Sequence, residues 1–337
     1  MPTLDVGLSL TGSGGPRQMV ERAVLAEERG VDSVWTSEAW GSDAYTPLAA
    51  IAARTKRIGL GTAIAQIASR SPGATAMTAL TLQELSEGRL RLGLGVSGPQ
   101  VIEGWHGLPF SRPLLATREY VTILRSALAA DQKVSFEGEV YQVPFRGKGA
   151  TGLGRALRST LPGWPQTPIL IAAIGPKNVV LAVEVADGLL PYLWSPTHWA
   201  RAWGKSIAGA PTGFQIAPTV FVAIGDDLER CRDAVRPRLA LHVGGMGSRE
   251  KNFYKDLLVA YGYEAEAQKI QDLFLSGDRT GASAAVSDHL VDELALVGSL
   301  ERVRDQLDAW RDGPITTMIA EPMDESSLVS FLEAWNR

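Results

Sequence analysis

Two segments of the sequence combine residue types that could bind a flat ligand carrying a phosphate. Residues 95–107 are rich in glycine and other small residues and also contain Trp105 and His106. Small residues let a planar ring approach backbone amides, and an indole or imidazole could face such a ring. Residues 173–178 place backbone N–H groups and Lys177 at an expected helix start, which is a suitable seat for a phosphate.

A third segment supplies a carboxyl group and an indole. Glu38 and Trp40 follow the short apolar run at residues 33–36. The carboxyl group could exchange a proton with a substrate, and the indole could cover an apolar ligand. Both residue types are also common in ordinary loops, so this segment alone does not indicate a site. Its role depends on its position in the fold.

The sequence lacks the other motifs that commonly carry chemistry. Three of the four histidines, His198, His242 and His289, lie in helical contexts without a partner at metal-ligand spacing, so no metal site is predicted. There is no Gly-x-Ser-x-Gly motif and no strong carboxylate pair for hydrolysis. The glycine-rich residues 12–15 lack the full dinucleotide-binding spacing. An organic cofactor is therefore expected to bring the reactivity.

The composition is that of an ordinary globular chain. Of its 337 residues 45% are hydrophobic, and 33 basic and 37 acidic residues are interspersed to give a net charge of −4. This pattern predicts no nucleic-acid-binding and no membrane-binding surface. The single cysteine, Cys231, excludes a disulfide framework. Residues 1–6 lack a signal-peptide pattern and no apolar run reaches about 18 residues, so we expect a soluble cytoplasmic protein.

Strand-like and helix-like patterns alternate along the chain and predict an α/β protein. Pro16 and Pro72 occupy expected first helical positions, and Gly30 and Gly88 follow expected helix ends. Apolar runs typical of strands occupy residues 5–10, 33–36, 58–64, 90–95, 169–173, 188–193, 216–223 and 315–320.

Eight such strands separated by helices predict a closed (β/α)8 TIM barrel, because an open doubly wound sheet usually stops at five or six strands. We expect one barrel domain, residues 1–337, with two insertions. The first, at about 131–167, combines a β-hairpin signal with a run rich in Gly, Pro and Arg. The second, at about 226–292, has helical patterns. Because barrel strands end at one face, we expect the three candidate segments to meet there.

The motifs at residues 95–107, 172–178 and 186–188 resemble those of the bacterial luciferase-like superfamily. The similarity covers nearly the whole chain, including residues 248–254, and is nearest to the coenzyme F420-dependent oxidoreductases, a branch with members similar to methylenetetrahydromethanopterin reductase. It implies a luciferase-like barrel that uses coenzyme F420, an 8-hydroxy-5-deazaflavin. It also implies hydride transfer between the deazaflavin C5 and a small organic substrate, and assembly as a homodimer.

The resemblance further implies roles for individual residues. A non-prolyl cis peptide bond between Ala63 and Ile64 would support the deazaflavin ring, and arginines such as Arg146 and Arg155 could meet its anionic tail. The residues implied in cofactor binding are Glu38, Ala63, Ile64 and Gln66 near the ring, Ser97 and Gly98 beside the ring and ribityl chain, Ala173, Ile174 and Gly175 at the phosphate, and Lys177 at the tail.

The chain departs from the family's alcohol and sugar dehydrogenases in two places. Some of them carry an Asp-His pair at the end of the second strand, where this chain has Glu38 and Ala39. Pro99 replaces a glutamate that follows the fourth strand. We therefore expect reduction of a C=C, C=N or C=O bond, with Glu38, His106 or water as the proton donor. Aromatic residues around the mouth, which include Tyr192 and Trp199, suggest an apolar planar substrate, and substrate contacts are expected from Trp40, Trp105 and Trp194.

Two alternatives stay open. The chain could be an FMN-dependent luciferase-like monooxygenase that uses O2, because the two groups share a fold. It could also bind a flavin or deazaflavin without catalysis, since the Asp-His pair is missing. The sequence does not identify the substrate or the direction of hydride transfer.

Overall fold

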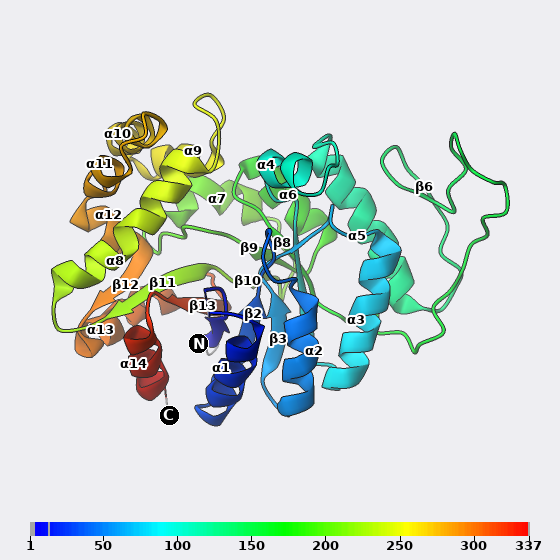
Figure 1. Ribbon diagram of the computed structural model, residues 1–337, viewed down its shortest axis with the longest axis horizontal. Helices are drawn as coiled ribbons and strands as arrows, with labels where there is room; N and C mark the ends of the chain where they lie inside the picture. The colour runs from blue at the N-terminus through cyan, green and yellow to red at the C-terminus, as the bar shows by residue number, and fades with distance from the viewer. Residues whose placement is uncertain (1–3, 13, 336–337) are drawn as a thin grey trace.

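A computed structural model of the chain describes residues 4–12 and 14–335. Ser13 and the two ends of the expected domain, residues 1–3 and 336–337, lie outside the described residues. A parallel sheet curls into a barrel with helices around it (Figure 1). Its strands are β1 (Asp5–Ser9), β2 (Ser33–Thr36), β3 (Gly59–Thr62), β4 (Ala65–Gln66), β5 (Leu90–Gly95), β8 (Ile169–Ala172), β9 (Gly188–Leu190), β10 (Gln215–Ile216), β11 (Thr219–Ile224), β12 (Ala295–Gly298) and β13 (Thr317–Pro322).

One broken strand closes the barrel. β10 pairs with β9 and β11 pairs with β13, while β13 lies beside β1. Pro218 separates β10 from β11, because proline has no N–H to give to the ladder. A bridge between Tyr192 and Thr219 joins the two halves. The predicted (β/α)8 barrel is therefore confirmed, with the seventh predicted strand split in two.

Two details differ from the sequence-based expectation. β12 pairs in parallel with β11 outside the barrel, and no strand was expected there. It is only four residues long, which is too short for a periodic signal. The last barrel strand spans Thr317–Pro322 instead of 315–320, which brings Glu321 into the strand.

The helices that follow the strands cover the outside of the barrel. Several begin with proline at the first turn, where the missing N–H costs nothing. Within the described residues, no helix is long and apolar enough to cross a membrane. These outer helices are α1 (Pro16–Glu28), α2 (Tyr45–Arg54), α3 (Pro72–Ser86), α5 (Pro113–Ala129), α6 (Pro176–Val185), α7 (Trp199–Ile207), α8 (Leu228–Ala240), α13 (Leu300–Arg311) and α14 (Glu325–Trp335).

A single indole fills much of the barrel interior. Trp35 is 1% exposed and packs with Leu170, Leu190 and other inward-facing apolar side chains. A Cβ on Gly7 would lie 2.5 Å from its Nε1, and one on Gly61 would lie 2.2 Å from its Cε3. Both positions must therefore lack a side chain for the ring to fit.

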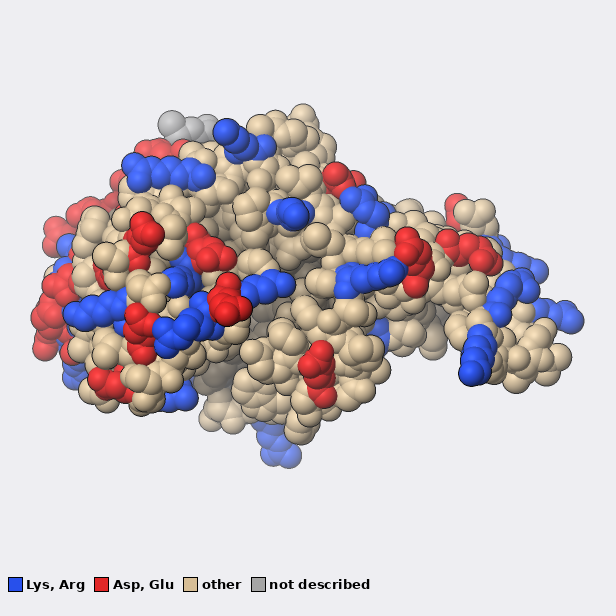
Figure 2. Space-filling model, turned by 90° about the horizontal axis from the view of Figure 1, so that it is seen from above, with Lys and Arg blue, Asp and Glu red and all other residues tan. Residues whose placement is uncertain are grey.

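The chain between α5 and β8 leaves the barrel as an arm, residues 134–166, which projects to the right in Figure 1. It starts with the hairpin β6 (Phe136–Glu137) and β7 (Gln142–Val143). Three successive N–H groups of the hairpin turn, residues 139–141, donate to the buried carboxylate of Glu119 at 2.8–2.9 Å. Beyond the hairpin, exposed basic side chains gather on the arm (Figure 2).

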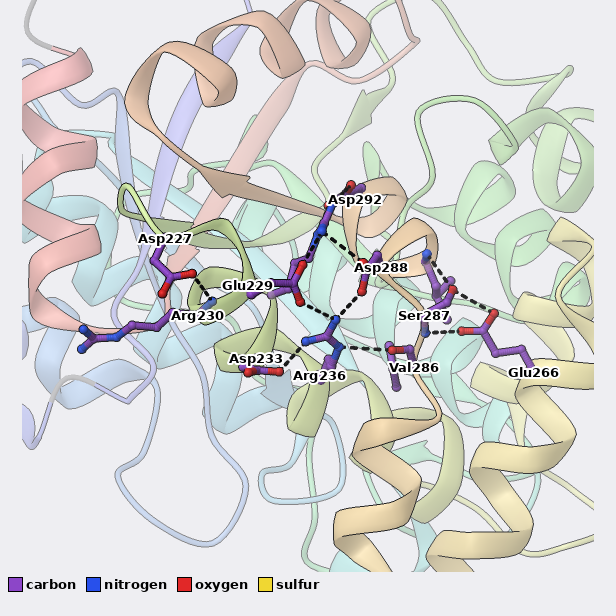
Figure 3. Close-up of polar contacts among 12 residues, drawn as sticks. Asp227, Glu229, Arg230, Asp233, Arg236, Glu266, Val286, Ser287, Asp288 and Asp292 are labelled. Carbon is purple, nitrogen blue, oxygen red and sulfur yellow. Dashed lines mark hydrogen bonds and ion pairs between the residues drawn. The ribbon is translucent and has the colours of Figure 1, made fainter.

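Five short helical segments between β11 and β12 gather on the opposite side of the barrel (Figure 1). After α8 they are η1 (Leu241–Gly245), α9 (Phe253–Tyr261), α10 (Glu264–Leu275), α11 (Arg279–Ala284) and α12 (Asp288–Leu294). Arg236 on α8 contacts the carboxylates of Glu229, Asp233 and Asp288 and the carbonyl of Val286 (Figure 3). These ion pairs join α8 to α12 and have a structural role.

Candidate active site

The first polar cluster at the barrel mouth surrounds Glu38, which lies just after β2. Its Oε1 accepts the N–H of Gln66 at 2.8 Å and lies 2.9 Å from the hydroxyl of Ser69. Its Oε2 accepts the N–H of Ala44 at 3.2 Å. Together with His106, these side chains form what we call the Glu38 cluster: Glu38, Gln66, Ser69 and His106.

The amide of Gln66 links Glu38 to His106. Its Nε2 donates to the carbonyls of Glu38 at 3.0 Å and Ala39 at 3.2 Å, so its Oε1 must be the atom that faces His106. That Oε1 lies 2.8 Å from His106 Nε2. Because an amide oxygen can only accept, Nε2 carries the proton and Nδ1 is the acceptor of the neutral ring.

The structure thus brings Glu38 and His106, the two predicted catalytic residues, into one hydrogen-bonded group. Both Glu38 oxygens already accept from donors of the surrounding loops. Such an arrangement holds those loops in place and leaves the carboxyl group little freedom to serve a ligand. The proton-donor role of either residue stays a prediction.

A cis peptide bond joins Ala63 to Ile64, where the resemblance placed one. It lies between β3 and β4 at the end of the barrel. The Ala63 N–H donates to the carbonyl of Thr36 at 2.7 Å, and the Ile64 carbonyl accepts from Glu38 N–H at 3.0 Å. The segment is therefore tied to the end of β2 on both sides of the bond.

The neighbouring strand end packs closely against this segment. A Cβ on Gly95 would lie 2.8 Å from Ile64 Cδ1 and 3.3 Å from Ala172 Cβ, so glycine is needed for close packing there. Ser97 follows with a φ of 58°, an uncommon left-handed conformation for a residue with a side chain. Gly98 then caps the short helix α4 (Pro99–Gly104). The result is a floor of small groups next to exposed backbone.

The predicted phosphate seat lies at the start of α6. Gly175 is the N-cap residue, and the Ile174 carbonyl is fixed by the indole N–H of Trp203 at 2.7 Å. Ala173 is buried, whereas Lys177 is exposed on the first turn of the helix. This geometry suits an anion, and binding by these residues stays a prediction.

Of the three tryptophans predicted to contact the substrate, one is misplaced. Trp40 and Trp105 are 63% and 65% exposed. Trp194 is 1% exposed and stacks with Trp199 at 5.6 Å and with Trp203 at 5.1 Å between ring centroids. Because the buried ring offers no surface to a ligand, the prediction for Trp194 is wrong.

A second polar group at the mouth, the Glu321 cluster, was not expected from the sequence. It comprises Tyr192 after β9, Arg238 on α8, His242 on η1, Tyr254 on α9 and Glu321 on β13. The His242 ring lies 4.7 Å from that of Tyr192 and 5.2 Å from that of Tyr254. No three or more His, Cys, Asp or Glu side chains in the described part of the chain, this cluster included, could hold a metal ion together.

Strand register shows that Glu321 faces the barrel axis. Ile319 belongs to the group of side chains inside the barrel, and residues two apart on a strand share a face. Glu321 is paired with Phe221, whose ring lies 5.8 Å from that of Tyr192. Glu321 therefore lies one layer above Ile319, toward the C-terminal end, where barrel enzymes carry their active sites. A charged residue two positions after an inward apolar one was the signal that could have revealed it.

Comparison with known proteins identifies the family of this chain. A family model described as luciferase-like monooxygenase matches residues 3–317. A Mycobacterium tuberculosis protein, provisionally named a coenzyme F420-dependent oxidoreductase, is 43% identical over 94% of both chains. The 5,10-methylenetetrahydromethanopterin reductase of Archaeoglobus fulgidus is 28% identical and covers 88% of this chain and 86% of its own.

Solved structures of other proteins share this fold. The coenzyme F420-dependent tetrahydromethanopterin reductase of Methanopyrus kandleri superposes with a TM-score of 0.80 at 21% identity, over 99% of this chain and 97% of its own. An F420-dependent secondary alcohol dehydrogenase has a TM-score of 0.75 at 19% identity over the full length of both chains. The chain belongs to the luciferase-like family.

Proposed function

We propose that the protein is a coenzyme F420-dependent oxidoreductase that transfers a hydride between the deazaflavin C5 and a small organic substrate. The 43% identical relative carries that assignment in its name. The observation that carries the proposal is the close packing of Ile64 and Ala172 against Gly95, which leaves no room for a side chain and makes a floor of small groups at the end of β5. A flat ring can lie on such a floor, and an anion can reach the α6 start beside it.

The residues present fit this cofactor. Ala63, Ile64, Ser97 and Gly98 would border the ring and the start of its ribityl chain. The backbone of residues 173–175 would hold the phosphate, because helix N-termini attract anions. Lys177 is exposed and basic and would meet the anionic tail. Arg146, by contrast, lies on the arm and faces Glu137 at 3.9 Å.

When bound, the deazaflavin would supply a hydride from C5. The protein's own contribution is to orient the two reactants. The Glu38 cluster fixes the loops after β2 and β4, and so keeps the floor in position. Trp40 and Trp105 offer exposed apolar surface around the mouth. Holding reactants in one geometry can account for roughly 7–11 kcal/mol of a barrier, so positioning is the main task expected of these residues.

The test is a fluorescence titration of the apoprotein with F420 and, separately, with FMN at matched salt. We expect micromolar or tighter binding of F420 and much weaker binding of FMN. Preferential FMN binding would favour the monooxygenase alternative. Binding of neither would contradict the proposal. F420 binding without turnover of any acceptor would favour a noncatalytic binding protein.

A pair of glycine variants locates the phosphate seat. A Cβ on Gly175 would already touch the Phe253 ring at 3.4 Å, so the two further methyl groups of Gly175→Val should crowd the α6 start and weaken F420 binding more than tenfold. Gly209 has no atom within 4 Å of its Cβ position, so Gly209→Val is the matched control and should bind normally.

Three further points stay predictions. We propose a homodimer formed through barrel helices, and the exposed Met77 and Leu85 on α3, 69% and 53%, support an apolar contact there. Light scattering of the purified protein tests this. The single barrel domain with two insertions and the cytoplasmic location also stay predictions.

A further inference from the structure

In the Glu321 cluster the carboxyl group is largely buried and the two phenols are half-buried, yet their oxygens lack protein hydrogen-bond partners in the described part of the chain. The Glu321 side chain has Arg238 Nη2 at 3.8 Å as its only charged neighbour, and neither of its oxygens has a hydrogen bond within the described residues. The phenol oxygens of Tyr192 and Tyr254 likewise have no hydrogen-bond partner there. Polar groups in such surroundings normally pair with protein or with water, so oxygens of three side chains in one place without a hydrogen-bond partner among the described residues are free to pair with a ligand.

These atoms are not sealed from solvent. Among the described residues, only Tyr263 Oη is sealed from solvent without a hydrogen bond. The oxygens of Glu321, Tyr192 and Tyr254 must therefore stay accessible, although Glu321 as a whole is only 7% exposed. A largely buried side chain whose oxygens remain open, at the C-terminal end of a barrel strand, is placed to meet a ligand.

The groups around Glu321 set its charge. Burial raises the pKa of Glu321, and the Arg238 guanidinium opposes this. Burial lowers the pKa of His242 to about 4, despite the hydrogen bond between its Nδ1 and the Arg238 carbonyl at 2.7 Å, so this ring is neutral near pH 7. Burial raises the pKa of Tyr254 to about 12 and that of Tyr192 well above its usual value, so both phenols keep their protons.

We propose that the Glu321 cluster is the substrate subsite of the barrel mouth and that Glu321 donates the proton that completes reduction. This rests on the proposed F420-dependent function. The phenols of Tyr192 and Tyr254 are neutral donors, which suits a substrate with a carbonyl oxygen, such as an enone or ketone. Glu321 takes the role that the sequence suggested for Glu38, whose oxygens are already occupied.

The proposed step is balanced. With the reduced deazaflavin bound, one end of the substrate double bond would receive a hydride with its two electrons. The O–H bond of Glu321 breaks, and its proton goes to the other end or to the carbonyl oxygen. The Glu321 carboxylate that remains is stabilised by Arg238 and regains a proton from solvent. The substrate gains two electrons and two hydrogens. The cofactor would lose the hydride and release one N–H proton to solvent, which balances the proton that Glu321 takes up.

The experiment compares wild type with Glu321→Gln and Glu321→Asp. F420 affinity is measured by fluorescence, and turnover with reduced F420 is measured on cyclohex-2-enone, acetophenone and 2-methyl-1-pyrroline from pH 5 to 9. General acids commonly contribute about 100-fold or more, so Glu321→Gln should lower turnover by at least that factor while F420 affinity changes less than about twofold. Glu321→Asp should recover part of the activity.

Two readouts separate proton donation from a structural role. The wild-type rate should fall as pH rises through the Glu321 pKa, and Glu321→Gln should lose this limb. Infrared difference spectra of the apoprotein, wild type minus Glu321→Gln, should show a carboxylic acid band that titrates above the ordinary glutamate range. Glu119→Gln, which changes another buried carboxyl group away from the mouth, should leave both readouts unaltered. If Glu321→Gln does not fold, Tyr254→Phe replaces it and should lower turnover at least tenfold.

The outcomes are distinct. Failure of wild type to bind F420 overturns the proposed function and this inference with it. F420 binding together with near-normal turnover in Glu321→Gln overturns only this inference. F420 binding without reduction of any acceptor by wild type overturns this inference and favours the noncatalytic alternative, and ionisation of Glu321 in the ordinary range overturns this inference as well.

Discussion

The two polar clusters at the barrel mouth contain similar residue types but differ in how their hydrogen bonds are used. In the Glu38 cluster, both carboxyl oxygens and the whole Gln66 amide have protein partners. In the Glu321 cluster, the carboxyl group and two phenols have none among the described residues. A saturated cluster fixes the shape of a site, whereas one with open positions is available to a ligand.

The largest effect should come from Glu38→Ala. Removing this carboxyl group leaves two backbone N–H groups without an acceptor, so the free energy of unfolding should fall by about 3 kcal/mol. The floor beside it should loosen, which would weaken F420 binding at least tenfold. Turnover at saturating F420 should change only a few fold. Denaturant titration, cofactor titration and steady-state rates measure the three quantities.

Glu27→Ala is the matched control for Glu38→Ala. The Glu27 carboxylate also accepts successive backbone N–H groups, those of residues 56–58, but it lies on α1 and not at the mouth. It should lower stability without changing F420 affinity. Equal losses of affinity in both variants would show that the Glu38 cluster has no special part in the site.

The next effect concerns pH. The pKa of buried His242 is about 4 in the folded state and about 6.5 in the unfolded state. The neutral ring therefore contributes stability above about pH 6.5, and this contribution is lost as the pH falls toward 4. Between pH 7 and pH 5 the wild type should therefore lose roughly 2 kcal/mol more than His242→Gln. The raised pKa of Glu321 acts with the opposite sign, because its contribution is lost as the pH rises. Urea unfolding at both pH values provides the measurement, and parallel losses in the two proteins would refute the burial argument.

The smallest expected effect is the position of the ring proton on His106 and on His242. His106 should carry its proton on Nε2, because Gln66 Oε1 can only accept. His242 should carry its proton on Nδ1, because the Arg238 carbonyl can only accept. Long-range ¹H–¹⁵N correlation spectra at pH 7.5 distinguish the two tautomers. The same tautomer at both residues would mean that one of the two networks is arranged differently.

The general architecture could be predicted from the sequence because it depends on periodic patterns. Alternating apolar runs, proline at helix starts and glycine after helix ends indicated the barrel, and β12 was missed because four residues carry no period. The position of the cis peptide followed from the resemblance and not from any local rule.

The direction of single side chains could not be predicted in the same way. Trp194 has the residue type expected at a ligand surface, but its ring is buried and stacks with the indoles of Trp199 and Trp203. Glu321 was placed just outside the expected last strand, so its inward face went unnoticed. The link from Glu38 to His106 depends on Gln66, forty residues from His106 along the chain, and no spacing rule indicates that contact.

The indole of Trp35, which lies over Gly7 and Gly61, has a consequence for how this protein can change over evolutionary time. Because it blocks the barrel, the depth of the site is set and no substrate enters between the strands. Substrate preference must then be determined by the loops above this level. Those loops can vary in length and composition while the strands beneath them stay constant. New activities could therefore arise in this chain without the risk to stability that accompanies changes in a packed core.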